Sequence, residues 1–554
     1  MTAWSSLCRV VARRARSFSS VRGISTIQDH NVVKSPYKAV SIPNINLVDF
    51  VWSAVEKVPE KTALICAVTG REYTYAEARK ISQRFAVSLQ KAGFKKGDVI
   101  AVVLPNIPEF PLILFGAIEA GLIVTTVNPT YTADEIFKQL INSGAIGVVT
   151  IPEIHETVQK AVKTLEAQIK RHIPIFHSPG LGESSSPEGI IKFEDMTSSN
   201  IDVSTLITNK EWRSDDVAVM PYSSGTTGLP KGVKLSHLNL VMNCTQIISE
   251  PKVTAAIRAS GDYQDVIPAL LPLYHIYGLV AIAIAALNYG SKVVTASMLY
   301  LVPPLIQFMA SHPDVKGSYL NSVRCVNNGA APVGPNDVDR FLTKAPQVTF
   351  MQGYGLTETS PVCCILEKGS TKYVSSGKPI PNTEMKIINR ETGENLGPNE
   401  NGEVCVKGPQ VMLGYHNNPE ATAETIDSTG WLHTGDMGYY DDDKDFFIVD
   451  RYKELIKVKG LQVAPAELED ILRSHPGVAD AAVIGIPDQR SGEVPRAYVI
   501  LKDSKLTEND VKKFISEKVS EHKHLAGGVE FVTSIPKNPS GKILRRKLKE
   551  MYSK

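Results

Sequence analysis

The sequence predicts an α/β protein with a large N-terminal domain of mixed, mostly parallel sheets and helices, followed by a small mobile α+β C-terminal domain. Three observations support this fold class. A chain of 554 residues is too long for one hydrophobic core. Short β-branched runs alternate with helical patterns, as they do in crossover units with parallel strands. The last part of the chain carries its own pattern of short strands and helices.

Hydrophobic patterning sets the elements of the large domain. Residues 99–104 form an apolar run that ends at a proline, which predicts a buried strand. The run is followed by a helical pattern with small and large apolar faces. Strand and helix patterns then alternate along the chain, in the order helix 109–120, strand 121–127, helix 132–143 and strand 145–151. A stretch rich in Pro, Gly and Ser at residues 176–190 predicts a surface loop.

A second boundary falls near residues 450–453, after the apolar strand pattern at residues 446–449. Beyond it, Pro465 suits the first turn of a helix at residues 465–475. Thr507 can cap a further helix, with Asp510 three residues on. The remaining elements are strands at 481–486 and 496–501 and this helix at 507–521. The predicted organisation is a leader at 1–28, a large domain at 40–450, a hinge at 451–453 and a small domain at 454–554.

The overall composition is that of an ordinary soluble globular protein, with 43% apolar and 21% charged residues. The seven cysteines are scattered and form no CxxC pair, so we expect reduced thiols and no zinc site. A formal net charge of +2 argues against a nucleic-acid-binding protein. The best apolar run, residues 276–287, is shorter than the roughly 20 helical residues that span a bilayer, so we expect no transmembrane segment.

The first 28 residues are typical of a mitochondrial transit peptide. They contain five arginines and many serines, and no acidic residue precedes Asp29. We therefore expect cleavage of this leader, recognition by the mitochondrial import machinery and a location in the mitochondrial matrix. A disordered basic tail is the alternative interpretation. A peroxisomal location ranks second, because the terminal residues 552–554 loosely resemble the SKL address but lack its leucine.

The most informative segment, residues 222–234, reads YSSGTTGLPKGVK. Its glycines let backbone N–H groups approach an anion, and its hydroxyls and lysine add donors and positive charge, so it predicts a phosphate cradle. A Walker loop is excluded, because Pro230 and Gly232 flank the lysine where a helix would have to begin. We expect a loop between two strands. The cradle residues are Ser223, Ser224, Gly225, Thr226, Thr227, Gly228 and Lys231.

Other polar patches share the same logic. Residues 352–358, QGYGLTE, follow a strand at 348–350 and offer a carboxylate and a hydroxyl that suit Mg²⁺ held against phosphate. Residues 328–332 form a small-residue loop on which a flat ring could lie. Asp436 beside a glycine is a plausible partner for ribose hydroxyls. Lys542, in a basic tail, could reach an oxyanion. The alternatives are an ordinary turn for residues 352–358, a turn residue for Asp436 and a solvated charged face for the tail of Lys542.

Seven motifs, in this order, resemble the adenylate-forming acyl-CoA synthetases, in the branch of 4-coumarate–CoA ligases, medium-chain acyl-CoA ligases and firefly luciferase. They are SSGTTGLPKG, LPLYHIYG, NNGAAPVG, QGYGLTET, GWLHTGD, VDRYKELIKVKG and PKNPSGKILRR. The resemblance covers residues 40–550. It implies that a carboxylic acid attacks the α-phosphate of ATP, that pyrophosphate leaves, and that the thiol of coenzyme A then attacks the acyl-adenylate. It also implies a need for Mg²⁺.

The resemblance assigns roles to the matching residues. Lys542 bridges the carboxylate and the α-phosphate during adenylation, and His275 gates the channel for coenzyme A. Rotation of the small domain at Lys453 then withdraws Lys542 and brings in the residues that serve the thiol. The catalytic residues are Lys542, His275, Thr357 and Glu358, and the metal is held by Glu358 and Thr226. Besides the cradle, the ATP and AMP site holds Gly329, Ala330, Ala331, Pro332, Gln352, Gly353, Tyr354, Gly355, Thr357, Asp436, Arg451 and Lys542. The coenzyme A site holds Lys457, Lys459 and Gly460, together with Gln462, and the acyl pocket holds Tyr277, Asn328, Gly329 and Val362.

Departures from the family pattern limit the choice of substrate. Asn328 replaces the usual first serine of SGAAP, and Val458 stands where plant coumarate ligases carry tyrosine. The second change weakens a strictly phenylpropanoid assignment, so the acid is predicted only as fatty or aryl. A luciferase-like adenylate oxygenase and a ligase that loads a carrier protein in trans are alternatives on the same scaffold. A non-catalytic acyl or nucleotide sensor is the alternative from another class; the presence of Lys542 and Glu358 argues against it.

Overall fold

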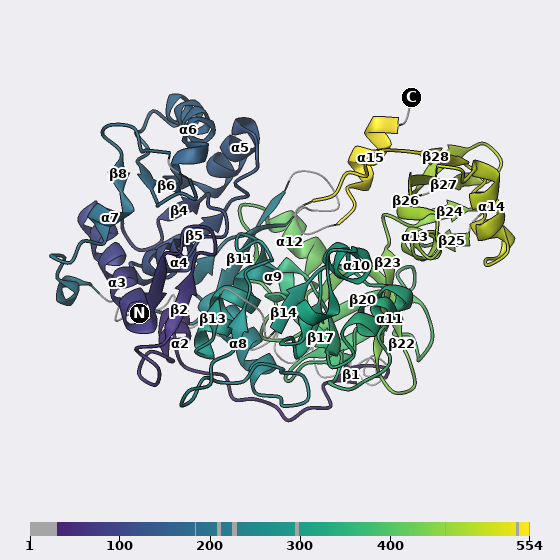
Figure 1. Ribbon diagram of the computed structural model, residues 1–554, viewed down its shortest axis with the longest axis horizontal. Helices are drawn as coiled ribbons and strands as arrows, with labels where there is room; N and C mark the ends of the chain where they lie inside the picture. Colours follow the sequence, from purple (N-terminus) through teal and green to yellow (C-terminus); the bar gives the residue numbers. More distant parts are fainter. Residues whose placement is uncertain are drawn as a thin grey trace, which may run out of the picture.

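The computed structural model describes residues 30–182, 184–207, 212–223, 230–293, 298–459, 461–502, 504–538 and 542–552. The described residues form five β-sheets, of which four build a large N-terminal domain and one builds a small C-terminal domain. In Figure 1 the small domain lies at one end of the elongated molecule, beside β23 and α11. The predicted leader lies outside the described residues, so the transit peptide stays a prediction. Among the described helices, none has the length and hydropathy that crossing a bilayer requires.

The first sheet has nine strands and a parallel centre, in which β4 pairs with β5 and β6. All four residues of β4 are buried, as expected for a parallel strand with both faces covered by helices. Its strands are β4 (Val99–Val102), β5 (Ile123–Thr126), β6 (Ala145–Thr150), β7 (Ile175–His177), β8 (Ile191–Lys192), β9 (Val217–Val219), β10 (Tyr222–Ser223), β11 (Lys231–Ser236) and β21 (Gly414–Tyr415). The helices around it include α3 (Tyr75–Lys91), α4 (Glu109–Glu119), α5 (Ala133–Ser143), α6 (His155–Ile169), α7 (Phe193–Met196) and α8 (His237–Ile248).

The predicted alternation of strands and helices from residue 99 to residue 151 is confirmed, element by element. Local chemistry explains the boundaries: a capping box of Thr132 and Glu135 begins α5, and Gly144 ends it in the left-handed conformation. The predicted loop at 176–190 begins too early, because β7 occupies its first two residues. That strand pairs with β6, and the pairing extends the apolar run beyond the point at which the sequence signal weakens.

Two further sheets complete the body of the large domain. One is β12 (Val266–Ile267), β13 (Lys292–Val293), β2 (Thr62–Ile65) and β3 (Glu72–Thr74), with α2 (Leu47–Trp52) nearby. The other is β14 (Met298–Leu301), β15 (Cys325–Asn328), β16 (Thr349–Gly355), β17 (Val362–Ile365) and β18 (Lys378–Pro379), with α9 (Ile276–Gly278), α10 (Pro303–Ser311) and α11 (Pro335–Lys344). The sequence predicts that the QGYG residues follow a strand at 348–350. They lie inside β16 instead. The reason is that β16 pairs with β15 from Thr349 to Gln352 and then with β17 from Gly353 to Gly355.

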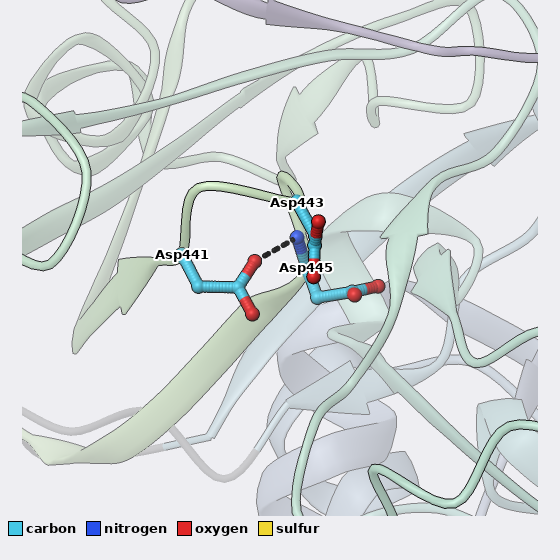
Figure 2. Close-up of side chains that lie close together, drawn as sticks. All are labelled: Asp441, Asp443 and Asp445. Atoms are coloured by element: carbon cyan, nitrogen blue, oxygen red, sulfur yellow. Dashed lines mark hydrogen bonds between the residues drawn. The ribbon is translucent and has the colours of Figure 1, made fainter.

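The fourth sheet is antiparallel and carries an acidic turn. Its strands are β1 (Val33–Lys34), β19 (Glu384–Ile388), β20 (Gly402–Lys407), β22 (Leu432–Tyr440) and β23 (Phe446–Arg451), and α12 (Pro419–Thr425) precedes β22. In the turn between β22 and β23, Asp441, Asp443 and Asp445 bring carboxylate oxygens within 4.8 Å of one another (Figure 2). The Nζ atom of Lys372 lies 2.8, 2.6 and 3.2 Å from these three side chains. The Lys372 ammonium therefore offsets part of the negative charge of the cluster, and Nζ of Lys378, 3.9 Å from Asp445, adds a second positive charge.

The small domain contains the fifth sheet and its own core. Its elements are β24 (Ile456–Val458), β25 (Leu461–Val463), β26 (Val478–Asp488), β27 (Gly492–Leu501), β28 (Val529–Phe531), α13 (Pro465–Arg473), α14 (Glu508–Ser516) and α15 (Arg545–Tyr552). The predicted helices and strands are present, and Thr507 caps α14 as expected. That helix is shorter than predicted, because the amides of Lys518 and Val519 both bond to the carbonyl of Ile515 in a closing turn. The exact hinge at residues 451–453 stays a prediction.

Replacing Lys372 with alanine tests how the acidic turn is held. The change leaves three carboxylates close together with only Lys378, whose Nζ lies 3.9 Å from Asp445, as a nearby counter-charge. We therefore expect a lower melting temperature at low ionic strength and partial recovery in high salt. Thermal unfolding at two salt concentrations measures this, with Lys368→Ala as the control for loss of a nearby exposed lysine. A melting temperature for Lys372→Ala that does not depend on salt more than that of the control would show that the ion pairs contribute little.

Candidate active site

A cavity of 1270 Å³ brings together most of the predicted site residues, which come from three of the sheets and from the C-terminal tail. The predicted residues that line it are Ser223, Lys231, His275, Tyr277, Asn328, Gly329, Ala330, Gly353, Tyr354, Gly355, Thr357, Glu358, Val362, Arg451, Lys453 and Lys542. Asp436 and Gln352 lie buried behind its wall, and Ala331 and Pro332 are not in the lining. Predicted residues outside the described part of the chain are Ser224, Gly225, Thr226, Thr227, Gly228 and Gly460.

The predicted phosphate cradle joins two antiparallel strands. Ser223 on β10 pairs with Lys231 on β11, so the glycine-rich segment connects the two ends of a hairpin, as the sequence predicts. The Oγ atom of Ser223 is buried and has no hydrogen-bond partner among the described residues. A buried hydroxyl without a partner at the edge of a cavity is a donor available to a ligand. The base of the hairpin therefore suits an anionic group.

A tyrosine that sequence reasoning missed joins the cradle to the acidic residue. The hydroxyl of Tyr415 donates a hydrogen bond of 2.9 Å to Oε1 of Glu358, and Nζ of Lys231 lies 4.8 Å from the centroid of the Tyr415 ring. Burial raises the pKa of Tyr415 above its usual range, so it stays a donor. Tyr415 is placed by the pairing of β21 with β11. Nothing in the local sequence signals that pairing.

A buried ion pair forms the wall opposite the cradle. The Nε atom of Arg451 lies 3.3 Å from Oδ1 of Asp436, and the hydroxyl of Tyr354 donates a 2.7 Å hydrogen bond to Oδ2. Asp436 and Arg451 face each other in the β22–β23 register, so the sheet itself sets the geometry. Burial raises the pKa of Asp436, while the positive charge of Arg451 opposes that shift. Asp436 is therefore a strand residue and not the turn residue of the alternative interpretation.

Close packing on Gly329 forms another part of the wall. A side chain on Gly329 would lie 2.8 Å from Cε1 of Tyr277, so only glycine lets that ring approach the backbone. The Tyr277 hydroxyl donates to the carbonyl of Asn327 at 2.9 Å. Asn328, the departure from the family motif, donates to Oε1 of Gln352 at 2.8 Å. Gln352 thus supports the wall from behind and does not line the cavity.

Lys542, near the end of the chain, and His275, in its middle, both line the cavity. Burial, and then the charge of Arg451, lower the pKa of Lys542 to about 8; Glu454 and Asp436 oppose this shift. Burial, and then the charge of Lys542, lower the pKa of His275 to about 4. His275 is therefore neutral at pH 7, and its Nδ1 accepts a 3.3 Å hydrogen bond from the amide of Tyr277.

The structure does not bring the predicted coenzyme A residues to the cavity. Lys457 and Lys459 are exposed on and beside β24, and neither lines the cavity. Their amides bond to Glu493 and to the carbonyl of Ser491 in the small domain. Gln462, on β25, is also exposed. The structure therefore shows the orientation in which Lys542, and not this group, occupies the site.

Two family models match the chain. The model of the AMP-binding enzyme matches residues 51–416, and the model of the AMP-binding enzyme C-terminal domain matches residues 467–542. The chain belongs to the AMP-binding enzyme family. Among curated members, 4-coumarate–CoA ligase 3 of Oryza sativa subsp. japonica is 39% identical and covers 94% of both chains. The 4-coumarate–CoA ligase 1 of Arabidopsis thaliana is 38% identical over 94% of this chain and 95% of its own.

Solved structures of AMP-binding enzymes share this architecture. ATP-bound MatB from Rhodopseudomonas palustris is 25% identical, with a TM-score of 0.80, and covers 92% of this chain and 99% of its own. The o-succinylbenzoate CoA synthetase MenE from Bacillus subtilis, in complex with an acyl-adenylate, is 27% identical, with a TM-score of 0.74, and covers 90% and 98%. These likenesses extend over both the large and the small domain. The roles of individual site residues stay predictions.

Tyr354→Phe removes the hydrogen bond to Asp436 and keeps the aromatic ring, so it tests what that bond contributes to stability. Loss of the donor leaves an Asp436 oxygen unpaired, which should lower the free energy of unfolding by about 1–3 kcal/mol at neutral pH and raise the pKa of Asp436 further. A group whose pKa is raised in the folded protein contributes stability that is lost as the pH rises. The difference in free energy of unfolding between the variant and the parent should therefore shrink in acid, where Asp436 is protonated. Urea unfolding across pH measures this.

Tyr439→Phe is the matched control, because its hydroxyl has no hydrogen bond among the described residues and its ring stacks on Phe447. We expect this control to remain within about 0.5 kcal/mol of the parent, as surface changes usually do. An equal and pH-independent deficit in both variants would contradict the role given to Asp436.

Proposed function

We propose that this AMP-binding enzyme joins a fatty or aryl carboxylic acid to coenzyme A through an acyl-adenylate, with ATP as the second substrate. The observation that carries this proposal is the position of Lys542. A lysine from the small domain lines the same cavity as Glu358 and as Arg451, the ion-pair partner of the buried Asp436. A charge at that place suits the α-phosphate and the incoming carboxylate. The relatives' names, as 4-coumarate–CoA ligases, support the same reaction.

In adenylation, each group of residues has a role that follows from its position and charge. The hydroxyl and lysine at the base of the β10–β11 hairpin hold the phosphates that leave as pyrophosphate. The wall of Tyr354, Asp436 and Arg451 holds the nucleoside. Lys542 stabilises negative charge that builds as the carboxylate oxygen attacks phosphorus, a contribution of roughly 3 kcal/mol by analogy with oxyanion donors. Holding both reactants in one cavity supplies the remaining advantage.

The donor set also suits Mg²⁺. Glu358 is 8% exposed, and only its Oε1 is bound by Tyr415 among the described residues. Thr357 lines the cavity beside it, and hard oxygen ligands with room for water are what Mg²⁺ prefers. Glu358 and the cradle hydroxyls would hold the ion, whose charge would offset that of the phosphates. Tyr415 keeps the carboxylate oriented, and Lys231 adds a second positive charge.

The acid would lie in the apolar part of the cavity next to Tyr277. Small and aliphatic side chains line this part: Ile247, Val253, Ala255, Val280, Ala281 and Ala285. They favour a neutral hydrocarbon or aromatic tail over one with a second charge. Apolar pockets separate substrates by only about 1–3 kcal/mol per methylene, so chain length and ring preference need measurement. Neutral His275 at the cavity would border the path of the thiol.

A screen of AMP production with ATP, Mg²⁺ and coenzyme A tests the proposed function. It should cover short- to long-chain fatty acids, hydroxycinnamic acids and a dicarboxylic acid as the charged control. We expect AMP and an acyl-CoA from at least one neutral-tailed monocarboxylic acid. AMP formation without a thioester, or no acid-dependent AMP at all, would contradict the proposal.

Replacing Lys542 with alanine should separate the two half-reactions. Acid-dependent ATP–pyrophosphate exchange should fall at least a hundredfold, the usual scale for losing one charge-stabilising donor. Thioester formation from supplied acyl-AMP should remain within a few-fold of the parent. Because Lys542 is replaced in an otherwise intact fold, an equal loss in both half-reactions would mean that the enzyme does not use two orientations.

Replacing Tyr415 with phenylalanine should weaken the hold on the metal while keeping the ring beside Lys231. Without the hydroxyl, Glu358 loses its hydrogen bond, and we expect the Mg²⁺ concentration for half-maximal exchange to rise about fivefold, from the roughly 1 kcal/mol of one such bond. Titration of Mg²⁺ at fixed ATP measures this. Tyr440→Phe is the control, because its hydroxyl bonds to the carbonyl of Leu396 and neither residue lines the cavity.

We further propose that residues 1–28 direct the protein to mitochondria, and that it serves fatty acid metabolism there. The support is their arginine- and serine-rich, acid-free composition. A fluorescent fusion that lacks these residues should stay in the cytosol, whereas the full-length fusion should enter mitochondria. Unchanged import of the shortened fusion would disprove the leader, and peroxisomal fluorescence of both would favour the C-terminal address.

A further inference from the structure

The first turn of α13 has no cap of its own. The residue before the helix is Ala464, which offers no side-chain acceptor, and Pro465 occupies the first position. The free amide of Ala466, at the second position, donates a 3.1 Å hydrogen bond to Oδ2 of Asp450. Asp450 lies on β23 of the large domain, before the predicted hinge. The cap therefore comes from the other domain.

A second contact joins α13 to the large domain. Gly334, at the start of α11, lies so close to Asp470 of α13 that a methyl group there would overlap Oδ1 of Asp470. The backbone of Gly334 has φ −71° and ψ 151°, which any residue adopts. The glycine therefore lets the Asp470 carboxylate lie against the backbone at the start of α11, and a larger residue there would force that side chain to move.

An apolar contact fills the space between these two points. Met437, Leu455 and Ala464 form one buried cluster, with Val449 packed against it. Met437 and Val449 belong to the large domain, whereas Leu455 and Ala464 follow the predicted hinge. Rotation of the small domain would open this cluster and would break the bond between Asp450 and Ala466.

The helix α13 is also tied to the catalytic lysine. Arg545, three residues after Lys542, forms an ion pair with Glu469 of α13 and a 2.9 Å ion pair with Glu454. Glu469 in turn accepts a 2.8 Å hydrogen bond from the amide of Val483 in the sheet of the small domain. The tail that carries Lys542 therefore moves with α13.

We propose that Asp450 is a positioning residue for adenylation, which rests on the function proposed above. By capping α13 across the hinge, Asp450, together with the Gly334–Asp470 contact, holds the small domain in the orientation that places Lys542 in the cavity. Breaking this interface shifts the population toward the other orientation. It slows adenylation and spares the thioester-forming half-reaction.

Three variants test the proposal through the two half-reactions. Asp450→Ala removes the cap and should lower acid-dependent ATP–pyrophosphate exchange about fivefold to tenfold, the scale of a lost helix cap. Thioester formation from supplied acyl-AMP should stay the same or rise. Asp450→Asn keeps an acceptor oxygen and should restore most of the exchange. Thr507→Ala removes a cap within the small domain and should leave the ratio of the two rates unchanged.

The glycine side of the interface provides an independent route. Gly334→Ala should lower exchange in the same selective way, and the double variant Gly334→Ala/Asp470→Ala should recover it, because the overlap is removed. Equal loss of both half-reactions in Asp450→Ala and Gly334→Ala, or no difference between Asp450→Ala and Asp450→Asn, would overturn the proposal.

Hydrogen exchange of residues 464–473 separates this inference from the proposed function. Asp450→Ala should increase amide exchange at the start of α13, whereas Thr507→Ala should not. Unchanged exchange would overturn the cross-hinge cap even in an active ligase. Conversely, a parent protein without acid-dependent exchange of pyrophosphate would disprove the function, while the amide measurement would still report whether Asp450 holds α13.

Discussion

The buried carboxylate of Asp436 is the charge around which the site is arranged. Water is largely excluded from it, so its negative charge is stabilised by Arg451, by the hydroxyl of Tyr354 and by the nearby ammonium of Lys542. Each of these groups comes from a different part of the chain. The β22–β23 pairing fixes the first partner, β16 supplies the second, and the small domain delivers the third. Without the carboxylate, Arg451 would lose this ion pair and the hydroxyl of Tyr354 would lose its acceptor.

This arrangement links the chemistry to the orientation of the domains. Burial lowers the pKa of Lys542 to about 8. At pH 7 the lysine is charged, but its burial makes that charge energetically unfavourable. A phosphate and a carboxylate substrate would provide the negative charge that the ammonium lacks. The contacts of α13 with β23 and Gly334 offset part of the cost of keeping the lysine there. The small domain is therefore placed by contacts that are separate from the substrate.

The sequence could predict what depends on local pattern. Glycines, hydroxyls and a lysine in one segment indicate a phosphate loop, and strand and helix periodicities place β4 to β6 within a few residues. The motif order predicts that Asp436, Arg451 and Lys542 share a site. The β10–β11 hairpin bears out the predicted loop between two strands.

What the sequence could not predict depends on pairing between distant segments. Tyr415 reaches Glu358 because β21 joins the edge of β11, and no residue near Tyr415 signals that register. Gln352 is buried because β16 continues past Phe350, pairing with β15 as far as Gln352 and with β17 beyond it. The residues around the start of α13 do not indicate its cap, because the acceptor, Asp450, lies on the other domain. Such contacts require the tertiary structure.

The most direct test of the account is the pH dependence of adenylation. If the ammonium of Lys542 stabilises the developing charge, kcat/KM for acid-dependent ATP–pyrophosphate exchange should fall above a pH of about 8, the pKa of Lys542 in the free enzyme. In Lys542→Arg the guanidinium stays protonated, so any remaining exchange should lack that decline. The same decline in both proteins would contradict the central role given to Lys542.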